Sequence, residues 1–139
     1  MIEPQPLQRL PDWRVRLTDY LNRVARLRFR PGRHDCALFA AGAVQAMTGI
    51  DPARGWRGYR TLNEGRLKLE RLGYGDHIAL AEAWLPEVPP SFGREGDIAV
   101  LDGDIDQSLG VVQGARIYVL RPGGLGLVSL TEAQRMFRV

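Results

Sequence analysis

The chain has 139 residues, of which 45% are apolar and 25% are charged, and its formal net charge is +3. This length suits a single globular domain, and this composition argues against a disordered or membrane protein. No apolar run approaches the ~20 residues of a membrane-spanning helix, and the start, MIEPQPLQRLPDW, has no signal-peptide core. We therefore expect the protein to stay where it is made unless a larger assembly carries it out.

The first thirty residues predict an irregular arm followed by a basic helix. Pro4 and Pro6 keep residues 1–10 from forming a helix, and this arm is free to contact a neighbouring protein. Apolar residues at helical spacing begin at Trp13, and most of the arginines fall between them. The pattern predicts a basic amphipathic helix over residues 11–30.

Positive charge is concentrated in the first part of the chain. Residues 1 to 60 carry eleven Arg against five acidic residues, whereas residues 61 to 139 carry eight basic against eleven acidic residues. Arginine favours planar, bidentate contacts with carboxylate or phosphate groups. The excess fits a solvated helix face or an interface with an acidic partner. Nucleic acid is not an expected partner, because there is no recognised binding motif and no aromatic interleaving to stack bases.

The most informative segment runs from residue 31 to residue 52 and predicts a buried central helix. Pro31 and Gly32 break the preceding structure, Asp35 is a suitable N-cap, and Gly49 is a suitable C-terminal cap. Apolar residues cover nearly all of the helix surface between them, which is typical of a helix inside a core. Cys36 then lies in the first turn, where the helix dipole favours its thiolate form.

Two further helices are predicted after a loop over residues 51–60. The loop contains Trp56 and Tyr59, which either cover a cleft or anchor a long connection. Thr61 is the predicted cap of a helix that ends near Leu72. Asp76 is the predicted cap of another helix, which Pro86 stops.

The last third changes from helical to strand-like patterning. Residues 131–136 predict a helical turn, and residues 137–139 a final extended segment. Helices followed by strands predict an α+β fold, a single domain over residues 1–139 with the cysteine helix packed on a C-terminal antiparallel sheet. Four short runs separated by turns predict an antiparallel meander: residues 97–101, 109–113, 115–120 and 125–130.

These features carry a resemblance to a known family. The chain resembles the NlpC-type papain-like cysteine peptidases, which cut the stem peptides of peptidoglycan, and it is more similar still to small NlpC-like phage and prophage tail proteins. The resemblance covers residues 28–139 and implies an NlpC-like papain fold. The segments that carry it are His34-Asp35-Cys36, Arg57-Gly58-Tyr59-Arg60-Thr61, Gly96-Asp97-Ile98-Ala99-Val100-Leu101, Leu109-Gly110-Val111-Val112-Gln113-Gly114, Gly123-Gly124-Leu125 and Phe137-Arg138-Val139.

The resemblance implies that Cys36 is the nucleophile, but it leaves the base unassigned. A thiol peptidase needs a base beside the sulfur, usually a histidine. In the family this histidine lies on the second strand, and alignment on Gly110 places Ser108 there. His34, two residues before Cys36, is the candidate base, although the more ordinary role of a polar residue there is to serve the turn and the start of the helix. His77, at the start of another helix, is the weaker candidate.

Two functions follow from this comparison. The first is a structural or assembly protein of a phage tail tip, part of the virion tail, with a degenerate NlpC-like site and with other tail hub and tip proteins as partners. The alternative is an active peptidoglycan-cleaving cysteine hydrolase of the tail, which uses Cys36 with His34 or a partner's residue as base. In the alternative, Cys36 would also be reactive rather than a small buried residue.

No metal or cofactor is expected. Cys36 is the only cysteine, so no internal disulfide can form, and one cysteine with two histidines does not reach the four ligands of a structural zinc site. Asp102, Asp104 and Asp106 resemble a fragment of a calcium loop. The glycine and distal glutamate of an EF-hand are missing, so we interpret the three carboxylates as a solvated turn.

Overall fold

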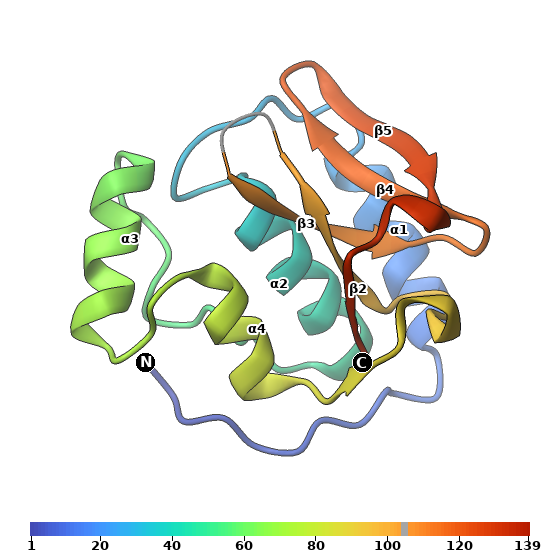
Figure 1. The fold of residues 1–139 in the computed structure, drawn as a ribbon, viewed down its shortest axis with the longest axis horizontal. Coiled ribbons are helices and arrows are strands. Elements are labelled where there is room, and N and C mark those ends of the chain that lie inside the picture. Colours follow the sequence, from blue (N-terminus) through green and yellow to red (C-terminus); the bar gives the residue numbers. More distant parts are fainter. Residues whose placement is uncertain (104–105) are drawn as a thin grey trace.

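The computed structural model describes residues 1–103 and 106–139. The chain folds as helices followed by strands, which confirms the α+β class (Figure 1). The four α-helices are α1 (Trp13–Val24), α2 (Cys36–Thr48), α3 (Leu62–Arg71) and α4 (His77–Trp84). The strands are β1 (Glu87–Val88), β2 (Ile98–Asp102), β3 (Gln107–Val112), β4 (Arg116–Arg121), β5 (Gly124–Ser129) and β6 (Arg135–Phe137), and two short 3-10 helices are η1 (Pro90–Phe92) and η2 (Leu130–Glu132).

The six strands form one open antiparallel sheet in the order β1-β6-β2-β3-β4-β5. The meander from β2 to β5 is the predicted one. The other edge was predicted only in part: the extended segment expected over residues 137–139 overlaps β6 at Phe137 alone, and β1 was not predicted, because two residues are too few to show an alternating pattern. Residues 131–136 do not form the predicted helical turn: η2 is a single 3-10 turn that ends at Glu132, and β6 begins at Arg135.

Helix α2 lies near the centre of the molecule, with α3 and α4 to its left and the sheet to its right (Figure 1), and it packs against α1 and β3. Its predicted caps are confirmed: the Asp35 carboxylate accepts a hydrogen bond from the Leu38 amide, and Gly49 adopts the left-handed conformation with φ of 81°. The absence of a side chain at Gly42 lets the Tyr20 ring of α1 contact the α2 backbone, where the Tyr20 hydroxyl donates to the Phe39 carbonyl at 2.9 Å. A small residue therefore sets the distance between α1 and α2.

Helix α1 is shorter than predicted. It ends at Val24, six residues before the expected end at residue 30. The Ala25 carbonyl accepts a hydrogen bond from the Leu125 amide, at 3.0 Å, so the chain leaves the helix to join β5. Arg30 and His34 then form an isolated bridge before α2. Contacts with a distant strand, which no local pattern shows, end the helix.

The arm over residues 1–10 has no regular secondary structure, as predicted, but it packs on its own domain. Ile2 and Leu7 lie against the core, and the Leu10 amide donates to the Met47 carbonyl at 2.8 Å. In Figure 1 the arm runs along the lower edge of the molecule, from beside α3 and α4 to α1. The arm thus closes the base of the fold.

A buried carboxylate joins this arm to the last residues of the chain. Asp97 is fully buried and accepts hydrogen bonds from Arg9 at 3.2 Å and from Arg138 at 3.0 Å. The amides of Arg94 and Val139 also donate to it, at 2.9 and 3.1 Å. A charge so far from water requires several donors. The two guanidinium groups and two amides supply them and hold both ends of the chain together.

Helices α3 and α4 begin at the predicted caps. Thr61 accepts from the Glu64 amide, and Asp76 accepts from the Ala79 amide. Each cap satisfies one of the amides that the first turn of a helix leaves unpaired. Helix α4 begins at His77, and it packs on the core through the buried Ile78, Leu80 and Trp84.

Candidate active site

A cleft of about 380 Å³ opens at the start of α2. This volume lies within the range of about 300–1,000 Å³ that is typical of ligand pockets. One wall comes from the loop over residues 51–60, whose Trp56 and Tyr59 are buried, and Trp56 is anchored by a 2.9 Å hydrogen bond from its indole to the Gly65 carbonyl. The other residues that line the cleft are Phe29, Asp35, Cys36, Ala37, Leu62, Arg66, Leu69, Asp76, His77, Gly103, Asp106, Gln107 and Ser108.

Cys36 is the first residue of α2 and is partly buried in this cleft. Burial alone would raise the pKa of its thiol. The hydrogen bond and positive charge of His77 outweigh that effect, and the Leu109 amide and Ser108 hydroxyl also hydrogen-bond the sulfur, so the pKa lies below its ordinary value. The thiolate is therefore favoured.

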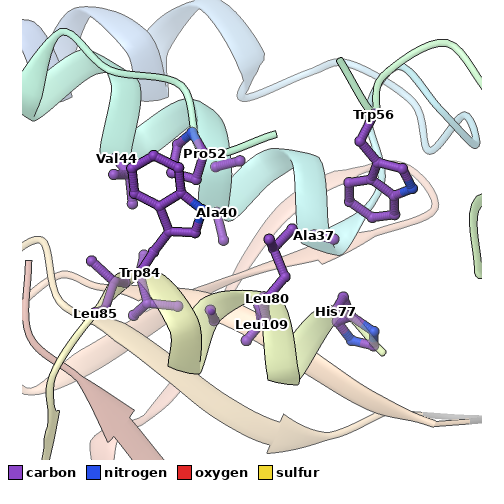
Figure 2. A pocket seen from close by; sticks show the side chains of 13 residues that line it. Ala37, Ala40, Val44, Pro52, Trp56, His77, Leu80, Trp84, Leu85 and Leu109 are labelled. Atoms are coloured by element: carbon purple, nitrogen blue, oxygen red, sulfur yellow. The ribbon is translucent and has the colours of Figure 1, made fainter. Parts of the chain in front are cut away.

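His77, the first residue of α4, supplies the imidazole at the thiol. It projects from α4 near the end of α2 where Ala37 lies (Figure 2). Its Nε2 lies 2.8 Å from the carbonyl oxygen of Gln107, so Nδ1 is the nitrogen left to face the sulfur. Burial lowers the pKa of His77, but the hydrogen bond and charge of Cys36, followed by Gln107 and Asp76, raise it to about 9.

The geometry therefore favours an ion pair between a Cys36 thiolate and a His77 imidazolium. Each group shifts the pKa of the other towards its charged form, and the two titrate as a coupled pair. The backbone amides in the first turn of α2 have no hydrogen-bond partner within the helix. The Asp35 side chain accepts a hydrogen bond from one of them, the Leu38 amide. The amides of Cys36 and Ala37 remain at the thiol end, where they could stabilise an oxyanion.

Asp35 fixes the position of this helix start. Its carboxylate is 1% exposed and accepts hydrogen bonds from the amides of Gly32 and Leu38, both at 3.0 Å, and from the Tyr59 hydroxyl. Tyr59 lines the cleft, so the same carboxylate holds both the helix that carries Cys36 and the cleft wall. Gly32 has φ of 75° and lies against the Tyr59 backbone, where a Cβ atom would collide.

His34, the base expected from the sequence, lies elsewhere. Its ring is buried and packs edge-on against Phe39, with ring centroids 6.2 Å apart. Burial lowers its pKa, against the opposing effect of Asp35. Neither the lining of the cleft nor the groups acting on the Cys36 thiol include His34. The geometry thus favours His77, the weaker candidate from the sequence, as the base.

Ser108 lies beside the sulfur, at the strand position where the resemblance expects a histidine. The imidazole reaches the same sulfur from α4 instead. The Gln107 carbonyl oxygen, 2.8 Å from His77 Nε2, is the group that orients the ring. A backbone acceptor leaves no trace in the side-chain sequence, so alignment could not reveal it.

Within residues 1–103 and 106–139, no group of three or more His, Cys, Asp or Glu residues is placed to hold a metal ion. Of the three aspartates that resemble a calcium loop, Asp104 lies outside the described residues. No helix of the described chain is long and apolar enough to cross a membrane.

Comparison with known proteins identifies a family, but the description of that family gives no function. Residues 8–139 match the model of a family described as a domain of unknown function (DUF6950). No curated protein matches the chain. Any assignment of function therefore depends on the residues in the cleft.

Proposed function

We propose that this chain, which belongs to the DUF6950 family, is a cysteine-dependent hydrolase of amide bonds with an NlpC-like papain fold. Cys36 is the nucleophile and His77 is the general base and acid. The observation that carries the proposal is that the Cys36 thiol and the His77 imidazole lie together at the start of a buried helix, inside a cleft of ligand size, where each acts on the pKa of the other. A nucleophile beside a base that a third group orients is the arrangement required for covalent catalysis.

The residues support a two-step reaction. The Cys36 thiolate attacks the carbonyl carbon of the scissile amide, and the amides at the start of α2 stabilise the negative oxygen that forms. The His77 imidazolium then donates its proton to the departing amine, which leaves a thioester on Cys36. His77 next accepts a proton from water as that water attacks the thioester, and the acid product leaves while the Cys36 thiolate and His77 imidazolium are restored.

The substrate class that fits the sequence resemblance is the peptide stem of peptidoglycan, and the setting is the phage tail. Such an enzyme would open the cell wall during genome entry. The assembly role at the tail tip is the second candidate. The serine at the family's histidine position motivates it, and it requires that the Cys36–His77 pair has no turnover.

Digestion of purified peptidoglycan tests the proposal. We expect the wild-type chain to release stem-peptide fragments or new free amines, and Cys36→Ala to release none, because no other nucleophile replaces the thiolate. Mass spectrometry of the soluble fraction measures the fragments. Circular dichroism of both proteins controls for folding. Absence of fragments from the wild type, at a concentration where a known wall hydrolase is active, would favour the assembly role.

The pH dependence of alkylation gives a test that needs no substrate. An ordinary thiol has a pKa of about 8.5 and loses reactivity about tenfold for each pH unit below it. Because the pKa of Cys36 is lowered, we expect iodoacetamide to label it rapidly at pH values where a free thiol is slow. Hydrolysis should fall as the pH rises through about 9, where the His77 imidazolium loses the proton that it gives to the leaving amine. An alkylation profile with an unshifted midpoint would count against the ion pair.

A further inference from the structure

A run of arginines on the connection between α1 and α2 takes no part in the proposed reaction. In Figure 1 this connection runs along the upper side of the molecule, from the end of α1 to the start of α2. Residues 25–33, the basic segment, contain no acidic residue and no lysine. All arginines of the basic segment are exposed: Arg26, Arg28, Arg30 and Arg33.

The fold holds both ends of the basic segment in place. The Ala25 carbonyl accepts a hydrogen bond from β5 at one end, and the Gly32 carbonyl accepts from the Gly58 amide at 2.9 Å at the other. Arg30 and His34 also exchange two backbone hydrogen bonds of 2.8 Å. A surface that is fixed before binding loses little conformational entropy when a partner docks.

The charge of the basic segment is not neutralised by side chains that the structure describes. Because a chain spans at most about 3.6 Å per residue, alternate arginines of the segment follow one another at no more than about 7 Å along the backbone. Like charges this close repel one another, whereas a row of carboxylates on a partner would be attracted. The ion pairs of the described residues use other arginines: Arg9, Arg14, Arg16, Arg57, Arg66, Arg135 and Arg138.

Two exposed apolar side chains alternate with these arginines. Leu27 is 48% exposed and Phe29 is 41% exposed. Phe29 also lines the cleft that holds Cys36, so the basic segment borders the opening of that cleft. Arginine and aromatic side chains are enriched at protein interfaces, and lysine is depleted there. The composition of the segment therefore favours a protein partner.

We propose that the basic segment is the docking site for an acidic segment of a partner protein, which runs across the arginines and covers the cleft beside Phe29. Carboxylates of the partner pair with the guanidinium groups, and its apolar side chains pack on Leu27 and Phe29. A bound partner thus controls access to Cys36. One exposed aromatic residue provides no series of stacking platforms for a nucleic acid. The inference concerns a surface outside the Cys36–His77 pair and does not depend on turnover.

A fluorescein-labelled peptide of about ten glutamate residues tests the surface, since it is long enough to span the basic segment. We expect fluorescence anisotropy to show saturable binding to the wild-type chain. Binding should weaken at high salt, because salt screens exposed charges, and a lysine peptide of the same length should not bind. Absence of binding, or a flat salt response, would overturn the proposal. Tighter binding of single-stranded DNA of the same length would also overturn it.

Charge reversal locates the binding surface. Arg28→Glu and Arg30→Glu should each weaken binding of the glutamate peptide by about five- to tenfold, because reversal removes an exposed ion pair, worth up to about fivefold, and adds a repulsion. Arg116→Glu is the matched control. Arg116 is exposed at the start of β4, whereas the opposite end of the β4–β5 hairpin, at Gly124, lies against the basic segment. Equal weakening by all three changes would show that only net charge matters and would overturn the proposal.

Protection of Cys36 from N-ethylmaleimide, which is small and uncharged, tests where the bound peptide lies. With the glutamate peptide at about ten times its Kd, about nine tenths of the chains are occupied, so labelling should slow by up to about tenfold. Under the same peptide concentration Arg28→Glu should be protected less. Binding without protection would overturn the proposed cover of the cleft. Thermal unfolding confirms that each variant folds, and the salt response of the wild type needs no variant.

The outcomes separate this inference from the proposed function. Alkylation of the wild type without peptide reports on the Cys36–His77 pair alone. If iodoacetamide then shows an ordinary thiol pKa, the proposed function fails and the docking surface stands on the binding data. If the thiol is reactive but the glutamate peptide does not bind, only the docking surface fails.

Discussion

Replacing His77 with alanine should lower peptidoglycan hydrolysis by about 10²–10⁴-fold, the usual contribution of a general acid and base. The Cys36 thiol would lose the hydrogen bond and positive charge that hold its pKa down, while the burial that raises its pKa would remain. The midpoint of the alkylation profile should therefore move to higher pH. Both quantities can be measured on the same preparation.

His34→Ala is the matched control, since it removes the only other histidine of the chain. His34 lies against Phe39 and outside the cleft, so its loss should change stability and leave the alkylation midpoint in place. His77→Gln adds a second comparison, because its amide can still bond the Gln107 carbonyl but cannot carry the proton. Activity that survives in His77→Gln and disappears in His34→Ala would contradict the assignment of the base.

Local signals in the sequence predicted the helices of this fold well. Asp35, Thr61 and Asp76 each accept the capping hydrogen bond expected of them, and Gly49 takes the left-handed conformation that ends α2. These devices act within a few residues, so the sequence shows them directly. The end of α1 at Val24 depends on a bond between Ala25 and a distant strand, which no local pattern contains.

The sequence predicted the position of the cysteine in the candidate site, but not which histidine lies beside it. A cysteine behind an N-cap at the start of a buried helix indicates a reactive thiol from sequence alone, and Cys36 occupies that position. The imidazole comes from α4, and its arrival depends on how a short helix packs against α2. Two signals pointed to it: His77 directly follows the cap Asp76, and the chain offers only one other histidine. The resemblance instead places the histidine on a strand, at the position that Ser108 occupies here, and so gave these two signals little weight.

Asp97→Ala should lower the stability of the fold by about 3 kcal/mol. Its carboxylate is fully buried and bonds Arg9, Arg138 and the amides of Arg94 and Val139. Removing one partner of a buried charged network costs about 3–5 kcal/mol. We take the lower limit because the Arg9 and Arg138 side chains keep 17% and 24% exposure and can regain water. Thermal unfolding should show a fall of about 10 °C, at about 3–4 °C for each kcal/mol.

The exposed pair of Arg66 and Glu70 supplies the control for this loss. Its side chains are 53% and 45% exposed, so Glu70→Ala removes an ion pair of the same type from a solvated surface. Such pairs contribute about 0–1 kcal/mol, because water competes for both charges. The unfolding temperature of Asp97→Asn should lie between those of the two variants. The asparagine side chain keeps one acceptor oxygen, but its NH₂ group faces the donors that surround Asp97. If Asp97→Ala unfolds within about 2 °C of Glu70→Ala, then burial of Asp97 does not hold the two ends of the chain together.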